Sequence, residues 1–516
     1  MKSLLLAALC GLGLLAFSTQ AAVRLPHIFG NDMVLQQGVA VPVWGWAAPN
    51  EKITVAFAGQ KREAVTKANG TWRLTLDALE ASSKPDVFRV FASNEIGFTN
   101  VVVGEVWFCS GQSNMEFALL HGVDNAEREK AAADFPLIRH FKAPHRYTPA
   151  PERDIDTAWE TTTPSGISDE SAVAYFFGRR LHQALKVPVG LINCSWGGTR
   201  IEPWIPACGF DGLPALASLK EHVDTADPKS PLHKKALADY VKALRDWIAD
   251  AEKKAAADVP VTSAPAALPE NLTFMTGRQH QEVTVLFNGM VAGLVPFAIR
   301  GAIWYQGESN NGEGMLYLEK TKALVNGWRQ VWGQGDFPYY LVQLAPFKYW
   351  GNASPTALPG IWEAQAAVPA AITNTGCTVI NDIGNVKDIH PRNKQEVGLR
   401  LANQALNRTY GLKDVAWSGP AYMSFAIEGA KMRLTFDHAE GLKTRDGKAP
   451  DWFELCGQDG LFVKAGAVIE GAAVVLSAPT VTAPMAMRFA WEQTAEPNLV
   501  NGLGLPAGAF RCGNKP

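Results

Sequence analysis

The chain carries few charged residues for its length and almost no excess of either sign. Its 516 residues contain 48 lysines and arginines against 50 aspartates and glutamates, so the formal net charge is only -2. A balance of this kind produces no broad field that would attract nucleic acid or an anionic membrane. We therefore expect a neutral substrate and no nucleic-acid partner.

Cysteine is also sparse, with seven residues in the whole chain. The cysteines show neither a CxxC pair nor a Cys/His ligand spacing, so we expect no metal site. Cys456 and Cys512 both lie in the last part of the chain, where they can either form a disulfide or remain free thiols. Cys109 and Cys194 lie inside apolar runs, where free buried thiols are the better interpretation.

The start of the chain has an apolar run that is too short to span a membrane comfortably. Lys2 precedes an apolar stretch at 4–17, and small residues follow it up to Ala22. This pattern is typical of a secretory signal peptide, here residues 1–22, with cleavage near Ala21 or Ala22. We expect a secreted or periplasmic protein without a membrane anchor.

The hydrophobic pattern divides the remaining sequence into three regions. Residues 23–100 contain short alternating runs between turn formers, which predict an N-terminal β domain. In residues 101–412, buried-strand runs alternate with helical patterns, which predicts an α/β domain with a parallel sheet. Alternation returns in residues 413–516 and predicts a C-terminal, sandwich-like β domain. An α/β protein with two flanking β domains is the expected fold class.

The α/β region has predicted strands at 102–108, 187–193, 298–305, 339–344 and 377–381, and predicted helices at 170–185 and 394–406. A segment at about 205–281 interrupts this alternation. In it, Ser230 and Pro231 are typical of a helix start, and apolar residues then recur at helical spacing. We expect an inserted helical segment that borders the site region.

Three motifs follow the ends of predicted strands, where open α/β sheets bind ligands. Gly111-Gln112-Ser113-Asn114 places a serine hydroxyl there, although a serine in this position is more often only a helix cap. Trp196-Gly197-Gly198-Thr199 has paired glycines, which let a backbone N–H approach a ligand closely. Gln306-Gly307-Glu308-Ser309-Asn310 offers a side-chain amide at Asn310.

A fourth motif, Asp388-Ile389-His390-Pro391, precedes the predicted helix at 394–406. A serine hydroxyl becomes a good nucleophile only when a base removes its proton and a carboxylate orients that base. Among the ten histidines, His390 alone has a carboxylate two residues away in a loop of this kind. We therefore predict that Ser113 and His390 meet at one edge of the sheet.

Together, GQSNM (111–115), WGGT (196–199), QGESN (306–310) and DIHP (388–391) resemble the sialate O-acetylesterase family of SGNH hydrolases. The motifs are also similar to those of acetylxylan esterases with the same fold. The resemblance extends from about residue 24 to the C-terminus. It implies a flavodoxin-like, three-layer sheet with helices on both faces. It also implies a serine esterase that removes O-acetyl groups from carbohydrates without a cofactor.

The resemblance implies a role for each motif. Ser113 would be the nucleophile, His390 the general base and Asp388 its orienting acid. The backbone N–H groups of Ser113 and Gly198 and the side chain of Asn310 would form the oxyanion hole. Many SGNH enzymes place the acid three residues before the histidine, where this chain has Lys387. Asp382 is therefore an alternative acid, and Glu308 is a more distant one.

The candidate substrate-binding residues are Gln112, Trp196, Arg200, Trp304, Gln306 and Glu308. The indole rings can either stack on sugar rings or pack beneath the loops. Arg200 can bind a sialic acid carboxylate or pair with Glu202. An acetylated sialic acid and a plant polysaccharide such as acetylated xylan both remain open as substrates. A non-catalytic carbohydrate-binding protein is the alternative from another functional class.

Overall fold

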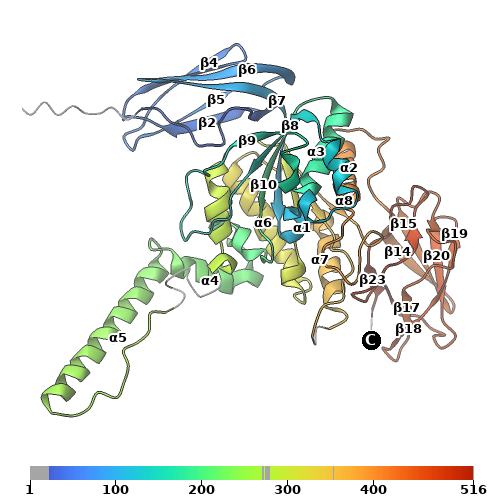
Figure 1. Cartoon of the computed structure of the whole chain (residues 1–516). Helices are drawn as coiled ribbons and strands as arrows, with labels where there is room; N and C mark the ends of the chain where they lie inside the picture. Colours follow the sequence, from blue (N-terminus) through green and yellow to red (C-terminus); the bar gives the residue numbers. More distant parts are fainter. Residues whose placement is uncertain (1–21, 270–271, 273–278, 352–353, 515–516) are drawn as a thin grey trace, which may run out of the picture.

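The computed structural model describes residues 22–269, 272, 279–351 and 354–514. The predicted signal peptide lies outside the described residues, except for Ala22. The fold is mixed α/β, with one large mixed sheet and several smaller β sheets. Figure 1 shows β-rich regions on two sides of a central body that contains most of the helices. No described helix is both long and apolar enough to cross a membrane.

The N-terminal and central strands are β1 (Val34–Gln36), β2 (Val41–Trp46), β3 (Lys52–Phe57), β4 (Gln60–Val65), β5 (Thr71–Leu76), β6 (Ser82–Phe91), β7 (Glu95–Gly111), β8 (Phe135–Lys142), β9 (Trp159–Thr162), β10 (Val189–Ser195), β11 (Gly301–Tyr305), β12 (Tyr339–Val342) and β13 (Thr375–Thr378). The helices are α1 (Ser113–Glu116), α2 (Ala126–Ala131), α3 (Ala172–Leu185), α4 (Ala217–Ala226), α5 (Pro231–Ala256), α6 (Leu316–Trp332), α7 (Ala357–Ala371) and α8 (Lys394–Arg408).

The central part of the large sheet has the strand order β13-β12-β11-β7-β10-β8-β9. All neighbouring pairs from β13 to β8 are parallel, and β9 is antiparallel to β8. The long strand β7 extends past both ends of the predicted strand at 102–108. Its first half pairs with β6 and β1, and its second half pairs with β10 and β11. One strand therefore passes without interruption from the N-terminal β region into the central sheet.

Two adjacent aromatic residues of β7 show how helices cover this sheet. The Trp107 ring packs edge-on against Phe177 of α3, with 5.0 Å between ring centroids. The Phe108 ring packs against Trp328 of α6, also with 5.0 Å between centroids. Because successive side chains of a strand point to opposite faces, α3 and α6 lie on opposite faces of the sheet. Helix α8 packs beside α3.

The predicted helix start at Ser230 is confirmed. The Ser230 hydroxyl accepts a hydrogen bond from the backbone N–H of Leu232 at 3.1 Å, and Pro231 occupies the first helical position. None of the described residues of α5 is buried, and Figure 1 shows this helix projecting from the body. Of the apolar positions found by helical spacing, Leu237 and Ile248 are more than 40% exposed, and Val241 and Leu244 are half-buried.

The C-terminal strands are β14 (Ala421–Glu428), β15 (Lys431–Asp437), β16 (Lys443–Thr444), β17 (Phe453–Cys456), β18 (Phe462–Lys464), β19 (Gly466–Glu470), β20 (Ala473–Ser477), β21 (Ala486–Phe489), β22 (Leu499–Val500) and β23 (Phe510–Gly513). They form two four-stranded sheets, in the orders β14-β15-β20-β19 and β18-β17-β21-β23, and the short pair β16-β22.

The disulfide considered for Cys456 and Cys512 is absent, and all six cysteines in the described part of the chain are free. Cys456 lies opposite Ala486, and Cys512 lies opposite Met487, so strand β21 separates them. Two strand spacings amount to roughly 9 to 10 Å, beyond the Cα separation of about 7 Å that a disulfide permits. The free-thiol alternative is therefore correct.

The Glu105 carboxylate connects three distant parts of the chain. Its side chain is 1% exposed and accepts hydrogen bonds from Gln37 Nε2 at 2.6 Å, Arg300 Nε at 2.7 Å and the Tyr410 hydroxyl at 2.9 Å. These partners come from the segment after β1, the residue before β11 and the segment after α8. Removal of this carboxylate would leave a partly buried guanidinium unpaired.

We expect Glu105→Ala to lower the free energy of unfolding by about 3 to 5 kcal/mol, as for other broken buried ion pairs. Urea unfolding followed by tryptophan fluorescence measures this change. The matched control is Glu63→Ala, because Glu63 pairs with Lys52 on the surface and should hardly affect stability. Equal unfolding midpoints for the two variants would contradict the connecting role of Glu105.

Candidate active site

Three parallel strands end at the same level of the sheet. Gly111 at the end of β7 lies opposite Ser195 of β10 on one side and Tyr305 of β11 on the other. Gly111 has a φ of 149°, and an added Cβ there would overlap the carbonyl oxygen of Tyr305. Only glycine fits this close approach. The three motifs that follow these strands therefore start side by side.

Ser113 and His390 meet at this edge. Ser113 is the first residue of α1, directly after the turn that ends β7, and His390 lies in the loop between β13 and α8. The Ser113 Oγ atom lies 2.9 Å from His390 Nε2, although 277 residues separate them in sequence. This distance allows the imidazole to accept the hydroxyl proton directly.

The three candidate acids have different surroundings. Asp388 Oδ1 accepts a hydrogen bond from the backbone N–H of His390 at 3.0 Å and lies 3.9 Å from the ring Nδ1. Asp382 instead forms two hydrogen bonds of 2.7 Å with Arg400. The Glu308 carboxylate accepts a hydrogen bond from Asn114. Of the three, Asp388 is the one that the structure places within ion-pair distance of the His390 ring.

The loop with the paired glycines lies beside the serine. Gly197 packs so closely that an added Cβ would be 3.2 Å from the Ser113 Cβ, and its own N–H is held by Glu116 Oε2 at 2.7 Å. Gly198 follows with a φ of 73°, a conformation that glycine adopts without strain. Neither the Ser113 N–H nor the Gly198 N–H has a hydrogen-bond partner among the described residues. Both remain available for an oxyanion.

The predicted oxyanion role of the Asn310 side chain is not supported by its contacts. Asn310 is fully buried, and its Nδ2 donates to Glu202 at 3.0 Å and to Glu313 at 3.1 Å. Its Oδ1 accepts the backbone N–H of Ile201 at 3.0 Å, which fixes the amide orientation. Carboxylates are stronger acceptors than neutral groups, so both amide hydrogens are already used.

Arg200 belongs to the same buried cluster and does not offer a free guanidinium. It forms ion pairs with Glu202 and Glu313, and Lys320 Nζ lies 2.6 Å from each of these carboxylates. Burial opposes the ionisation of Glu202, but Lys320 and Arg200 outweigh it and lower its pKa to about 2. Of the two alternatives for Arg200, the structure favours pairing with Glu202 over binding a substrate carboxylate.

Most of the remaining substrate-binding candidates are buried, and their side chains stabilise the loops at the strand ends. Trp304 is 1% exposed and packs in the core, so it presents no face to a sugar. Gln306 is fully buried and donates to the carbonyl oxygen of Thr199 at 3.1 Å. Gln112 is 3% exposed and accepts the backbone N–H of Gly307 at 3.2 Å. These contacts hold the three strand-end loops together.

Trp196 is the candidate aromatic side chain that stays partly exposed. Its ring stacks between His145 and His280, with centroid distances of 4.2 Å and 5.1 Å. His145 in turn lies 2.7 Å from the Glu116 carboxylate, which also binds the Gly197 N–H. The sequence did not identify His145, because 51 residues separate it from Trp196 and no shared motif links them.

Sequence reasoning also missed a buried cation beside the histidine. Lys394 is fully buried at the start of α8, and its Nζ donates to Asn114 Oδ1 at 2.5 Å. Asn114 then donates to Glu308 Oε1 at 2.6 Å and to the carbonyl oxygen of Ile389 at 3.0 Å. Burial lowers the pKa of Lys394 to about 7 and raises the pKa of Glu308. Lysine at the start of a predicted helix gave no signal of burial.

The electrostatic setting keeps His390 in its neutral form. Burial lowers the pKa of His390 below its ordinary value of 6.5, and the Lys394 ammonium lowers it further. Asp388 acts in the opposite direction but does not outweigh them. A neutral imidazole that accepts a hydrogen bond from a serine hydroxyl is the state that a general base requires.

Comparisons with known proteins agree with this geometry. A model of the family described as carbohydrate esterase, sialic acid-specific acetylesterase, matches residues 103–225. The sialate O-acetylesterase of Rattus norvegicus is 29% identical over 474 residues, which cover 82% of this chain and 81% of the rat protein. The sialate O-acetylesterase of Homo sapiens is 29% identical over 469 residues and covers 82% of this chain and 79% of the human protein.

A solved structure extends the likeness over nearly the whole molecule. The crystal structure of a novel carbohydrate acetylesterase from Xanthomonas citri is 31% identical in sequence and has a TM-score of 0.79. The match covers 95% of this chain and 99% of the bacterial chain, so it includes the β-rich regions as well as the central sheet. The chain belongs to the sialic acid-specific acetylesterase family of carbohydrate esterases.

Proposed function

We propose that this protein is a serine esterase that removes O-acetyl groups from carbohydrates through an acyl-enzyme intermediate. The hydrogen bond of 2.9 Å between Ser113 Oγ and His390 Nε2 is the observation on which the proposal rests. Family membership supports the same reaction. An acetylated sialic acid is the first candidate substrate, as in the mammalian relatives, and a plant polysaccharide such as acetylated xylan is the second.

The proposed reaction uses groups of the chain at every step. Ser113 Oγ attacks the acetyl carbonyl carbon while His390 Nε2 accepts the hydroxyl proton. The backbone N–H groups of Ser113 and Gly198 bind the oxyanion, and Asp388 stabilises the imidazolium. The sugar oxygen then leaves with the proton from His390. Water, deprotonated by His390, attacks the acetyl-serine and releases acetate, which regenerates Ser113.

The same proposal includes the finer assignments of fold and location. We assign residues 101–412 to an SGNH-type, flavodoxin-like domain with helices on both faces of its sheet, flanked by β domains at 23–100 and 413–516. The positions of α3 and α6 on opposite faces of β7 support this arrangement. The signal-like pattern of residues 1–22 supports secretion or export to a periplasm.

One observation supports retaining the second candidate substrate. Sialic acid carries a carboxylate, and Arg200 is the candidate cation at the strand ends. Its guanidinium is already paired with two carboxylates, Glu202 and Glu313. A further anion would have to displace one of them. A neutral acetylated sugar needs no such exchange, so the pairing of Arg200 supports keeping a xylan-type ester as the second candidate.

Ser113→Ala tests the proposed function directly. We expect hydrolysis of 4-nitrophenyl acetate to fall by about three powers of ten or more, because the nucleophile is lost. Acetate release from O-acetylated sialic acid and from acetylated xylo-oligosaccharides should fall by the same factor. The compound that the wild-type enzyme hydrolyses faster identifies the substrate sugar. The control is Ser165→Ala, an exposed serine in a loop. Equal rates in the wild type and Ser113→Ala would reject the esterase.

Asp388→Asn tests the assignment of the acid. We expect kcat to fall by about two to four powers of ten, because an amide cannot stabilise the imidazolium. Asp382→Asn is the matched control, since it breaks the pair with Arg400 and should lower stability while kcat stays within a few-fold. Steady-state kinetics on the folded variants separates the two, and the opposite order of effects would make Asp382 the acid.

Lys394→Met tests the electrostatic role of the buried lysine. Without the nearby ammonium, His390 should keep its proton to a higher pH. Catalysis needs neutral His390, so the acidic limb of the kcat/KM profile should move to higher pH. In the wild type this limb should lie below pH 6.5. Lys387→Met removes an exposed lysine near the same loop and should leave the limb in place. An unshifted limb in Lys394→Met would contradict this role.

A further inference from the structure

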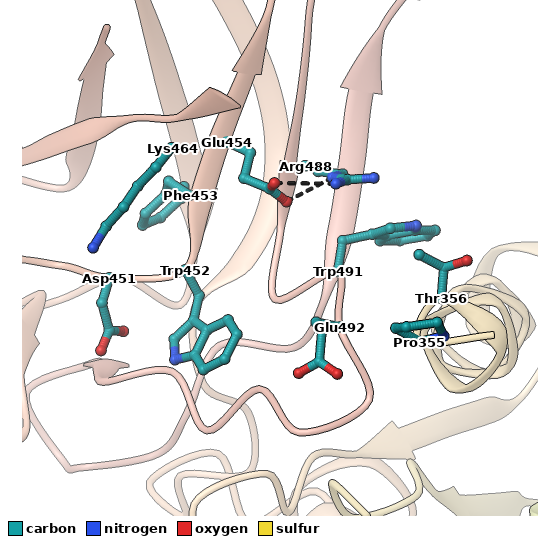
Figure 2. A pocket seen from close by; sticks show the side chains of 10 residues that line it. All are labelled: Pro355, Thr356, Asp451, Trp452, Phe453, Glu454, Lys464, Arg488, Trp491 and Glu492. Atoms are coloured by element: carbon teal, nitrogen blue, oxygen red, sulfur yellow. Dashed lines mark hydrogen bonds and ion pairs between the residues drawn. The ribbon is translucent and has the colours of Figure 1, made fainter. Parts of the chain in front are cut away.

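A cavity lies away from the Ser113–His390 pair, between the C-terminal sheet β18-β17-β21-β23 and the start of α7. Its volume is about 500 Å³, a size typical of small-molecule sites. It is lined by Pro355, Thr356, Asp451, Trp452, Phe453, Glu454, Lys464, Arg488, Trp491 and Glu492 (Figure 2). The two walls are joined by a hydrogen bond of 2.8 Å from the Gln493 N–H to the Pro355 carbonyl oxygen, so the cavity is preformed.

Trp452 has a strained backbone that places its ring in this cavity. Its φ of 59° lies in the left-handed region, which is rare for a bulky residue and costs of order 1 to 3 kcal/mol. The Ala490 N–H, which bonds the Trp452 carbonyl oxygen at 3.0 Å, helps to hold this conformation. Figure 2 shows the indole ring at the open space. Strain that persists in this way is often found at ligand-binding positions.

Trp491 supplies a second aromatic ring, and a cation–π contact holds this ring in place. The Arg511 guanidinium lies 5.0 Å from the centre of the Trp491 ring. Arg511 is itself held by the Glu363 carboxylate of α7, at 2.7 Å and 2.9 Å. Trp491 is only 8% exposed and forms part of the wall, so Trp452 offers the larger aromatic surface in this cavity. Such surfaces suit the apolar sides of sugar rings.

The rest of the lining offers hydrogen-bonding groups of both kinds. Glu454 and Arg488 form a two-fold pair at 2.6 Å and 3.0 Å, so their charges cancel. Asp451 and Glu492 each accept one backbone N–H, from Asn498 and Thr494 respectively, and each carboxylate keeps an oxygen free of partners within the described chain. The Lys464 ammonium has no hydrogen bond or ion pair with any described residue.

We propose that this cavity binds a neutral glycan chain and holds it on the enzyme apart from the Ser113–His390 pair. Trp452 stacks on a sugar ring, with the mostly buried Trp491 as part of the wall, and Asp451, Glu492 and Lys464 bind the sugar hydroxyls. The nearly balanced charges of the lining favour a neutral ligand over an anionic one. The choice of a carbohydrate as ligand rests on the proposed function.

The test measures binding of xylohexaose to the full-length chain with Ser113→Ala as background, using isothermal titration calorimetry. We expect Trp452→Asn to raise the Kd by about tenfold or more, because the stacking ring is lost. Asparagine tolerates the left-handed backbone, so this variant should fold. Trp452→Phe keeps a ring and should bind within about threefold of the background, since stacking needs only an aromatic face.

Two controls separate this proposal from the esterase. Trp247→Ala removes a tryptophan of the projecting helix α5 and should leave the Kd unchanged. With Ser113 intact, Trp452→Asn should hydrolyse 4-nitrophenyl acetate at the wild-type rate. An unchanged Kd in Trp452→Asn, or no binding of xylohexaose by the background chain, would overturn the glycan site. Absence of 4-nitrophenyl acetate hydrolysis alongside Trp452-dependent binding would instead reject only the esterase.

Discussion

The parallel register of β7, β10 and β11 is the constraint on which the site depends. These strands end opposite one another at Gly111, Ser195 and Tyr305, so the loops after them begin at one level. Register in this sheet is fixed by packing on both of its faces, because a shift by one residue would turn Trp107 and Phe108 to the opposite faces and away from Phe177 and Trp328. The close approach of Gly197 to Ser113 follows from this register. The 2.9 Å contact with His390 needs, in addition, the loop before α8.

Buried charge supports the strand-end loops from two sides. On one side, Lys320 and Arg200 neutralise Glu202 and Glu313, which hold the Asn310 amide. On the other side, Lys394 and Glu308 are joined through Asn114 next to Ile389 and His390. Buried ions are costly unless they are paired and hydrogen-bonded, so these clusters restrict how the loops can move. The Ser113 and Gly198 N–H groups have no hydrogen-bond partner within the described residues.

Much of the architecture could be predicted from hydrophobic pattern. The helices at 172–185 and 394–408 start and end within two residues of their predicted bounds, because long amphipathic runs with clear caps give a strong local signal. The full length of β7 could not be predicted, since residues 95–101 become a strand through pairing with β6. Helical spacing found α5 but not its environment, because periodicity does not show which element a face packs against.

The sequence by itself determined which residue types follow each strand: a serine, paired glycines and an acid–histidine loop, each placed by short-range turn and strand signals. Only the tertiary structure decided how these groups are used. In the folded protein Asp382 pairs with Arg400, whereas Asp388 lies beside His390. The Asn310 amide donates hydrogen bonds to two carboxylates. The tertiary structure also separated Cys456 from Cys512 by a strand. The hydrogen-bond partners of these buried side chains lie far apart in the sequence. Local sequence patterns therefore cannot predict which side chains will pair.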